Sequence, residues 1–581
     1  MTGGATGPAD RAAAAPPPFS PLIVAFSCNW CSYAGADLAG ISRMQYPPTV
    51  RLVRLMCSGR VHPAFVLRAL ELGADGVLVS GCHPGDCHYT FGNKSAELEV
   101  ASAQRLAAAA GLSPDRVRLQ WVSASEGALF ARTVSELSRR LVEIGPSPLR
   151  VERELDACLG VGEAGGEGSG EGAGEGAGEA GRVAPDAPGA RLQEAFAATH
   201  AFRCIECGKC TGICPVTAHL PSFIPRRLVV KGLYGMEDEL AADPSMWACL
   251  TCGLCKEACR VDVDLPEFFR RVRAIARAGG SAEVPTHGGL VHTFERLCSH
   301  PALAPRINGW AEAPGLRLDP ASDTAFVAGA AAALADIVND VPYDPSAVPR
   351  AAVRVLSAIG VQPRLVEGER PSGHDLFYSG EDEAFARLAR LNVDALRATC
   401  ARRAVFACPE AMHAYRDLYP RALGEALGVE CVHLVQPLAE AVRAGKVAFR
   451  PMAEGAGGVT IAYHDSCRMG RSLGLYDEPR LVLGAAGARL VEMADNRAYA
   501  ICCGVGAWQR CDPTSRQIRQ GRLTEAREAG ASILISPCSR CTLHFQCQAC
   551  HDGTGTVNSG ETKIMDLAVY VADRIAHQKV G

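Results

Sequence analysis

The cysteines of this chain are its most constraining feature. The sequence of 581 residues holds 26 of them, a high proportion for a large chain whose thiols stay reduced. Most stand in short clusters, and one spacing, C-x2-C-x2-C-x3-C, occurs at 204–214 and again at 249–259. A small secreted domain would pair such cysteines in disulfides, but a chain of this length can bury more than one hydrophobic core. The clusters therefore predict metal ligation.

Charge and hydropathy exclude other classes of protein. The 59 basic and 63 acidic residues give a net charge of −4, which leaves no excess to neutralise a phosphate backbone, so we expect no nucleic acid partner. The most apolar stretch, 325–338, is too short to span a bilayer. The N-terminus lacks a charged segment followed by an apolar one. We therefore expect a cytoplasmic protein with no direct membrane span.

The composition changes along the chain and predicts five parts. In the Gly/Glu-rich stretch within residues 151–190, the regular spacing of the glutamates would place them on one face of a helix. Because glycine destabilises such a helix, we expect this stretch to be an extended tether. The predicted parts are a disordered tail (1–20), a small domain (21–150), a Gly/Glu-rich linker (151–190), a domain of short helices around cysteine loops (191–290) and a larger domain (291–581).

Short apolar runs alternate with helical patterns in the small domain. The predicted strands, 22–28, 50–57, 76–82 and 117–124, and helices such as 63–72 and 96–110 favour a doubly wound parallel α/β fold. Three of these strands end in cysteine, and the carboxyl ends of parallel strands meet at one edge. We expect one site there, with thiols from Cys28, Cys57 and Cys82 and, from the loops, Cys31 and Cys87.

An α/β pattern returns near the C-terminus in two copies. The segments 405–411 and 534–541 both end a strand-like run, and each follows a predicted helix. Their offset of 130 residues predicts an internal duplication. The fold class is therefore α/β at both ends of the chain, with a mainly α segment between them.

The repeated spacing in the middle is the two-cluster ferredoxin pattern. Three closely spaced thiolates hold one face of a [4Fe–4S] cluster, and the fourth cysteine of each run reaches the other cluster. The predicted ligands are Cys204, Cys207, Cys210 and Cys259 for one cluster, and Cys249, Cys252, Cys255 and Cys214 for the second. The alternative is a pair of structural zinc sites. This segment resembles the dicluster ferredoxin subunit of heterodisulfide reductase and other dicluster ferredoxin domains.

A second cysteine pattern lies near the C-terminus: 34 residues separate Cys467 from Cys502, and 34 separate Cys503 from Cys538 in a closing C-x2-C pair. It resembles the cysteine-rich CCG domain of heterodisulfide reductase, also found in glycolate oxidase iron-sulfur subunits. The resemblance implies that one noncubane [4Fe–4S] cluster is held by Cys467, Cys502, Cys503, Cys538 and Cys541. A vicinal disulfide or a zinc site is the alternative.

The first copy departs from that family pattern. Ser372, Gly373 and His374 occupy the positions of the Cys-Cys-Gly triplet. Only Cys408 remains of the C-x2-C pair, because Ala411 occupies the position of its second cysteine. We therefore expect a structural role for this copy, with metal ligation by His374 and Cys408 as the alternative. Three further thiols, Cys511, Cys547 and Cys550, favour packing or labile-thiol roles over another cluster.

The small N-terminal domain resembles the delta, iron-sulfur subunit of methyl-viologen-reducing hydrogenase, in the segments 28–40, 54–61 and 81–93. The resemblance implies one [2Fe–2S] cluster on four of the five cysteines. His83 and His88 are expected to support the site rather than to bind iron. It also implies as partners a hydrogenase or formate dehydrogenase and a flavin-containing protein similar to the flavin subunit of heterodisulfide reductase.

The order of these segments predicts an iron-sulfur electron-transfer protein of a heterodisulfide-reductase-like complex. No G-x-G-x-x-G follows a strand, so the flavin is expected on a separate protein. One alternative is a catalytic subunit that reduces a disulfide or oxidises a small hydroxyacid at the CCG motif. Another is a zinc-stabilised scaffold. The sequence identifies no catalytic acid or base.

Overall fold

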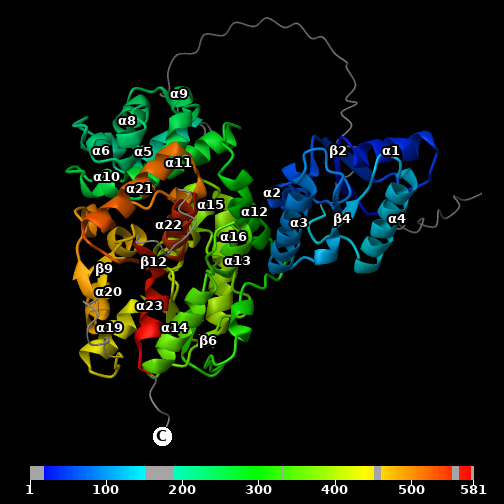
Figure 1. The fold of residues 1–581 in the computed structure, drawn as a ribbon. Coiled ribbons are helices and arrows are strands. Elements are labelled where there is room, and N and C mark those ends of the chain that lie inside the picture. The colour runs from blue at the N-terminus through cyan, green and yellow to red at the C-terminus, as the bar shows by residue number, and fades with distance from the viewer. Residues whose placement is uncertain are drawn as a thin grey trace, which may run out of the picture. The chain divides into compact units, whose positions relative to one another are not determined.

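A computed structural model describes residues 19–150, 188–329, 331–338, 340–450, 459–551 and 562–576. The chain forms two compact units, the first made of residues 1–62, 68–100 and 115–152, and the second of 63–67, 101–114 and 153–581. Most of the predicted tail and linker lies outside the described residues. The helical middle and the C-terminal region belong to the same unit (Figure 1).

The N-terminal sheet is parallel, with strand order β2-β1-β3-β4. Its central strand β3 is buried along its whole length, whereas the edge strand β2 is largely exposed. Ala25 and Leu78 pack in its core with Phe130 and Val134 of the last helix. The elements are β1 (Ile23–Cys28), α1 (Ser32–Ile41), β2 (Val50–Leu55), α2 (Pro63–Glu71), β3 (Gly76–Gly81), α3 (Gly92–Ala109), β4 (Val117–Trp121) and α4 (Gly127–Ile144).

The helical middle, residues 188–298, contains no strand among its described residues. Each cysteine run there contains a very short helix. A glycine in the left-handed conformation (Gly208, φ 76°, and Gly253, φ 82°) immediately precedes each of these helices, a backbone conformation that glycine adopts without strain. The helices are α5 (Pro188–Ala198), α6 (Lys209–Gly212), α7 (Pro215–His219), α8 (Pro225–Leu233), α9 (Glu237–Ala241), α10 (Leu254–Glu257), α11 (Leu265–Ala278) and α12 (Leu290–Cys298).

The C-terminal region holds two parallel four-stranded sheets with matching strand orders, β6-β5-β7-β8 in the first copy (324–443) and β10-β9-β11-β12 in the second copy (460–574). The parallel α/β prediction for both ends of the chain is confirmed. The N-terminal sheet has the same order.

The first copy consists of β5 (Thr324–Val327), α13 (Ala331–Ile337), α14 (Ala347–Ala358), β6 (Arg364–Leu365), α15 (His374–Tyr378), α16 (Asp382–Ala398), β7 (Arg403–Phe406), α17 (Pro409–His413), the short π-helix η8 (Ala414–Leu418), α18 (Tyr419–Leu423), β8 (Glu430–His433) and α19 (Val435–Arg443).

The second copy consists of β9 (Thr460–Tyr463), the short π-helix η9 (Arg468–Ser472), α20 (Asp477–Ala485), β10 (Arg489–Val491), α21 (Pro513–Glu528), β11 (Ile533–Ser536), α22 (Ser539–His551), β12 (Lys563–Asp566) and α23 (Leu567–Arg574).

Candidate metal centres

The five N-terminal thiols lie together at the carboxyl ends of β1 and β3. The Sγ atom of Cys82 is 3.8 Å from that of Cys28 and 2.8 Å from that of Cys31. Cys57 and Cys87 are hydrogen-bonded to each other. Burial raises the pKa of the Cys82 thiol, so a free thiolate is unfavourable there. A bound metal ion would replace the proton and stabilise the thiolate. The geometry fits a thiophilic metal.

The two histidines that flank these thiols have other partners. His83 Nε2 lies 2.7 Å from a carboxylate oxygen of Glu126, and the His88 ring stacks on Trp30 at 3.9 Å between centroids.

Gly92 lies against the cysteine site. A Cβ atom built on Gly92 would lie 2.3 Å from the Sγ atom of Cys57. The start of α3 therefore requires glycine because the cysteine site lies against it.

The eight cysteines of the helical middle gather in two four-thiol groups. One cavity is lined by Cys204, Cys207, Cys210 and Cys259, the first four-thiol group. A second cavity is lined by Cys214, Cys249, Cys252 and Cys255, the second four-thiol group. Apolar side chains complete both linings, among them Val229 and Val263 in the first and Phe223 and Phe269 in the second. Each group thus combines three cysteines of one run with the last cysteine of the other.

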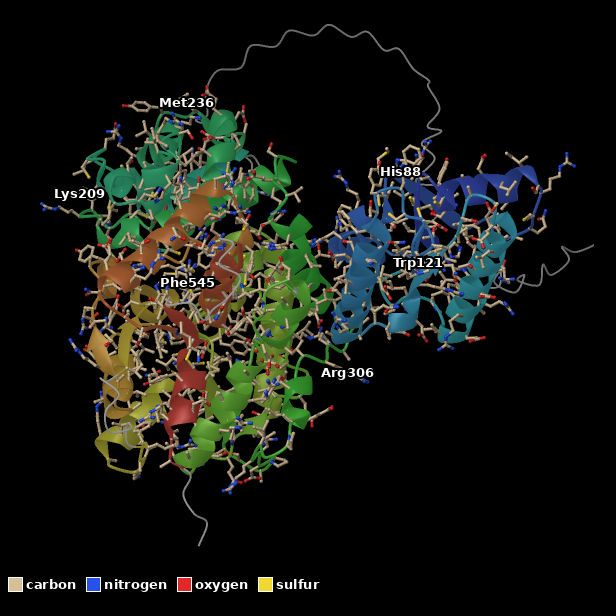
Figure 2. The ribbon with its side chains drawn as sticks, viewed as in Figure 1. His88, Trp121, Lys209, Met236, Arg306 and Phe545 are labelled. Atoms are coloured by element: carbon tan, nitrogen blue, oxygen red, sulfur yellow. The ribbon has the colours of Figure 1, made fainter. Side chains whose placement is uncertain are left out.

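The two groups differ in exposure. Cys207 of the first group is exposed, and the neighbouring Ile205 is 64% exposed. Lys209, labelled in Figure 2, also lies on the outer surface. In the second group, Cys249 and Cys252 are buried. The first group therefore faces solvent, and the second lies deeper in the same unit.

The five cysteines of the CCG motif form one connected cluster of thiols, here called the CCG site. Cys502 is hydrogen-bonded to Cys467 and Cys503, and Cys503 also to Cys541. Cys541 is in turn hydrogen-bonded to Cys538. The contacts with Cys502 and Cys541 hold the pKa of the Cys503 thiol well below its usual range. Such a set of sulfur donors suits iron, although zinc would also accept sulfur donors.

Two thiols from other segments reach the CCG site, which the sequence did not predict. Cys252 of the second four-thiol group is hydrogen-bonded to Cys502, and that bond lowers the pKa of the Cys252 thiol to about 6. Cys408 of the first copy is hydrogen-bonded to Cys538 of the second. Cys408 and Cys538 are 130 residues apart, which is the offset of the internal duplication. The duplication is therefore the sequence feature that could have predicted their contact.

Two arginines that follow Cys467 join the CCG site to the second four-thiol group. Arg468 donates to the backbone carbonyl of Thr251 at 2.9 Å and to its hydroxyl at 3.0 Å. Arg471 donates to the carbonyl of Cys252 at 2.7 Å. Neither guanidinium forms an ion pair with a carboxylate among the described residues. Their charges therefore offset the thiolates that surround them.

The first copy presents buried ionic side chains where the second presents cysteines. His374 accepts a hydrogen bond from Arg468 at 2.9 Å. Arg540, from the second copy's C-x2-C turn, forms ion pairs with Asp375 and Glu410. Burial lowers the pKa of His374 to about 4, so the imidazole is neutral. His374 therefore uses its Nε2 atom as an acceptor for Arg468.

The remaining thiols beside the motif lie on or near α22. A hydrogen bond from His544 lowers the pKa of Cys511 to about 7. The same imidazole lies 2.8 Å, by its Nδ1 atom, from the carbonyl of Cys503. Burial raises the pKa values of Cys547 and Cys550. Phe545, labelled in Figure 2, is fully buried, and its ring lies edge-on to that of His464 at 5.0 Å between centroids.

Comparisons with known proteins identify three segments. Residues 23–145 match the family described as methyl-viologen-reducing hydrogenase, delta subunit. Over 132 residues the chain is 46% identical to the vhc iron-sulfur subunit of the F420-non-reducing hydrogenase of Methanococcus voltae, and it covers 92% of that protein. The chain belongs to this family. The alignment takes in 23% of the chain, the delta-subunit domain.

The same domain occurs in a larger relative. The chain is 48% identical over 147 residues to one subunit of the ferredoxin:CoB-CoM heterodisulfide reductase of Methanosarcina mazei, and it covers 18% of that protein. It is 49% identical over 128 residues to the iron-sulfur subunit of the F420-non-reducing hydrogenase of Archaeoglobus profundus, covering 93% of it. The chain thus spans less than a fifth of the heterodisulfide reductase relative.

The other two segments follow the delta-subunit domain in the predicted order. Residues 200–263 match a 4Fe-4S dicluster domain, and residues 461–546 match a cysteine-rich domain of the CCG type. The predicted fusion of these three kinds of domain is confirmed, and the chain carries iron-sulfur domains that include the 4Fe-4S type. No helix of the described residues is both long enough and apolar enough for a transmembrane span.

Proposed function

We propose that this chain transfers electrons between iron-sulfur centres, namely those of its dicluster domain and a cluster at the CCG site. The observation that carries the proposal is the contact between Cys252 and Cys502. Cys252 is a predicted ligand of the second cubane, and Cys502 is a predicted ligand of the CCG cluster. Because electron transfer is fast only between close centres, a direct contact of their ligands supports an electron path.

The exposure of the thiols gives the path an order. The first four-thiol group would hold a [4Fe–4S] cluster near solvent, where a partner protein can exchange electrons with it. The second would hold a [4Fe–4S] cluster in the interior, beside the CCG site. Cys255 of the second group also interacts electrostatically with Cys210 of the first. The three centres therefore form a series from surface to interior, along which electrons can move in either direction.

The CCG site would hold one noncubane [4Fe–4S] cluster on Cys467, Cys502, Cys503, Cys538 and Cys541. Vicinal cysteines such as Cys502 and Cys503 allow one thiolate to bridge two irons. The first copy would hold no cluster of its own, because His374 accepts from Arg468 and its one aligned cysteine, Cys408, contacts Cys538 of the CCG site. In the delta-subunit domain, four of the five clustered thiols would hold a [2Fe–2S] cluster.

The relatives suggest the partners. Their names describe iron-sulfur subunits of hydrogenases and one subunit of a heterodisulfide reductase. We propose that the delta-subunit domain exchanges electrons with a flavin-containing protein similar to that heterodisulfide reductase subunit, and with a hydrogenase or a formate dehydrogenase, in one cytoplasmic complex. Fusion of three redox domains in one chain keeps successive centres at a high effective concentration.

A catalytic role for the CCG site is the second candidate. A cavity of about 270 Å³ reaches Cys252 and Arg468, so a small molecule could approach this end of the path. Reduction of a disulfide or oxidation of a small hydroxyacid would then be the reaction.

The test is the iron and acid-labile sulfide content of the full chain, purified without oxygen. The proposal predicts about 14 irons per chain, and an occupied first copy would raise that number to about 18. A content near 10 would leave the CCG cysteines without a cluster. Zinc in place of iron would overturn the electron-transfer function.

A further inference from the structure

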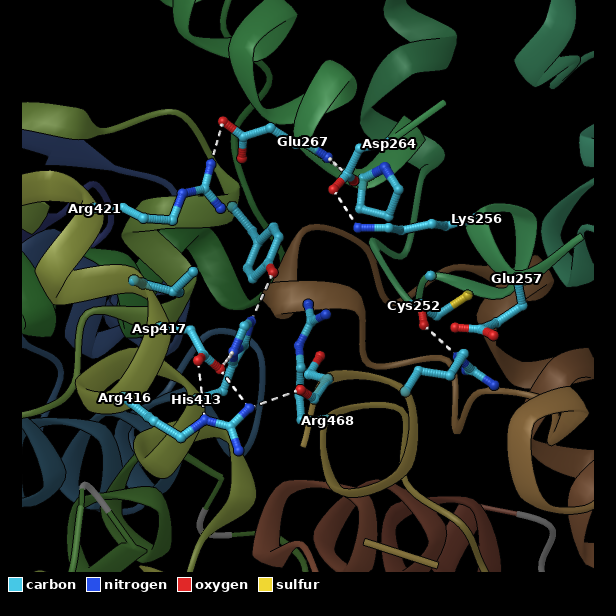
Figure 3. A pocket seen from close by; sticks show the side chains of 16 residues that line it. Cys252, Lys256, Glu257, Asp264, Glu267, His413, Arg416, Asp417, Arg421 and Arg468 are labelled. Carbon is cyan, nitrogen blue, oxygen red and sulfur yellow. Dashed lines mark hydrogen bonds and ion pairs between the residues drawn. The ribbon is translucent and has the colours of Figure 1, made fainter. Parts of the chain in front are cut away.

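The cavity beside the CCG site lies where three parts of the second unit meet. The helical middle supplies Lys256 and Glu267, the first copy Arg416, and the second copy Arg468 and Ser472 (Figure 3). Its volume of about 270 Å³ is near the lower end of the range of about 300–1,000 Å³ that is typical of small-molecule sites. The space therefore suits a compact metabolite.

Positive charge predominates in the lining. Three of its acids have basic partners: Asp264 is 2.6 Å from Lys256, Asp417 is 2.9 Å from Arg416, and Glu267 is 3.2 Å from Arg421. The lining contains two more cations, Arg468 and Arg471, and one more acid, the exposed Glu257. An anionic group that enters the cavity thus meets two guanidinium groups without carboxylate partners among the described residues, Arg468 and Arg471, beside the ion-paired Arg416 and Arg421.

One guanidinium has donor capacity left for such a group. The Nη2 atom of Arg471 is buried and has no hydrogen-bond partner among the described residues, and an unmade hydrogen bond of this kind is costly. Arg421, at the other side of the cavity, has a side chain that is 55% exposed. Guanidinium groups bind carboxylate and phosphonate oxygens in pairs, through two parallel N–H bonds.

A hydrogen-bonded chain that ends on a carboxylate forms another part of the wall. The hydroxyl of Tyr378 lies 3.3 Å from Nε2 of His413, whose Nδ1 atom is 3.0 Å from Asp417 (Figure 3). Burial holds the pKa of His413 well below its usual range, so the imidazole is neutral. Asp417 accepts from Nδ1–H, which leaves Nε2 to accept from Tyr378. Tyr378 and the neutral His413 can therefore contact the polar, uncharged part of a bound molecule.

We propose that this cavity binds a small organic molecule through oxyanion groups, carboxylates or phosphonates, held by Arg471 at one side and by Arg416 and Arg421 at the other. The inference rests on the proposed function and extends it, because it names the class of molecule that would exchange electrons at this end of the path, where the second four-thiol group meets the CCG site. Cys252 lines the same cavity, so the bound molecule would lie beside a ligand of the second cubane.

Anaerobic equilibrium dialysis of the full, iron-loaded chain tests the proposal with three probes: malonate, methylphosphonate and the uncharged malonamide. We expect saturable binding of malonate or methylphosphonate that weakens with salt, and none of malonamide. Arg421→Gln should weaken binding by about tenfold. Its loss leaves Glu267 paired with Arg270 and Arg271, so the fold should persist. The stronger of the two anions identifies the head group.

Arg390→Gln is the matched control, because Arg390 pairs with Glu425 at the surface and does not line the cavity. Binding should be unchanged in this variant. Equal weakening in both variants, equal binding of malonamide, or no binding of either anion up to about 10 mM would overturn the inference. Iron content and the electron paramagnetic resonance spectrum of the same samples distinguish a failure of this inference from a failure of the proposed function. Only a failure of the proposed function would appear as missing clusters.

Discussion

At the scale of single residues, positive charge placed among thiolates shapes the CCG site. Arg468 is only 5% exposed, yet its guanidinium lies 4.2 Å from the ring centroid of Tyr378 and bonds to Thr251 and His374. A buried charge needs compensation. Tyr378, Cys467, Glu410 and Cys502 provide it by electrostatic interaction, so the arginine and the cysteines stabilise one another.

Replacement of Arg468 should therefore change a reduction potential. An added electron makes a cluster more negative, and a nearby guanidinium stabilises that state. We expect Arg468→Gln to lower the midpoint potential of the CCG cluster by on the order of 100 mV. Anaerobic redox titration followed by electron paramagnetic resonance measures it. Arg468→Lys keeps the charge and should recover most of the potential, and an unchanged potential in the glutamine variant would contradict the account.

Gly92 gives a second residue-scale prediction, in the delta-subunit domain. A methyl group there would lie 2.3 Å from Cys57 and 3.3 Å from Cys87. We expect Gly92→Ala to reduce the iron bound by this domain and to weaken its visible absorption. The control is Gly40→Ala, since a Cβ atom at Gly40 meets nothing within 4 Å and alanine favours a helix. Normal iron content in Gly92→Ala would show that the thiols do not bind a cluster in this geometry.

At the scale of elements, the two cysteine runs exchange their last cysteines. Cys214 begins α7 and lines the second cavity, while Cys259 follows α10 and lines the first. Double substitutions test this exchange. Cys204→Ser with Cys259→Ser should lose the same four or so irons as either single variant, because both remove one cluster. Cys204→Ser with Cys214→Ser should lose about eight.

The control for these variants is Cys298→Ser, which changes a buried cysteine outside both cavities. Its iron content should equal that of the unchanged chain. A loss of about eight irons from the Cys204 and Cys259 pair would show that each run holds its own cluster. Analysis of iron and sulfide, with the two cubane signals resolved spectroscopically, distinguishes the outcomes.

The sequence predicts these elements well where local patterns determine them. Apolar runs that end at Cys28 and Cys82 predict strands, and thiol spacing predicts the grouping seen around Cys214 and Cys259. Contacts between elements leave no such pattern. Nothing near Tyr378 or His413 in the sequence indicates that these residues meet, because α15 and α17 are joined only by the packing of the first copy. The contact of Cys252 with Cys502 likewise depends on how two domains pack.

At the scale of the whole molecule, the second unit combines an exposed thiol group, a buried one and the CCG site in one compact body. The dicluster and cysteine-rich domains pack against each other within this unit. The arginines that follow Cys467 in the second copy bond to carbonyls of the helical middle. The sequence predicts the order of the domains but not this interface.

The central claim is that the second cubane and the CCG cluster exchange electrons directly, and the spin coupling between them tests it best. In partially reduced, anaerobic protein in which both centres are paramagnetic, the account predicts a split electron paramagnetic resonance signal. Cys214→Ser removes the second cubane and should leave an unsplit CCG signal. Two independent, unsplit signals in the unchanged chain would show that the centres are far apart and would contradict the proposed path.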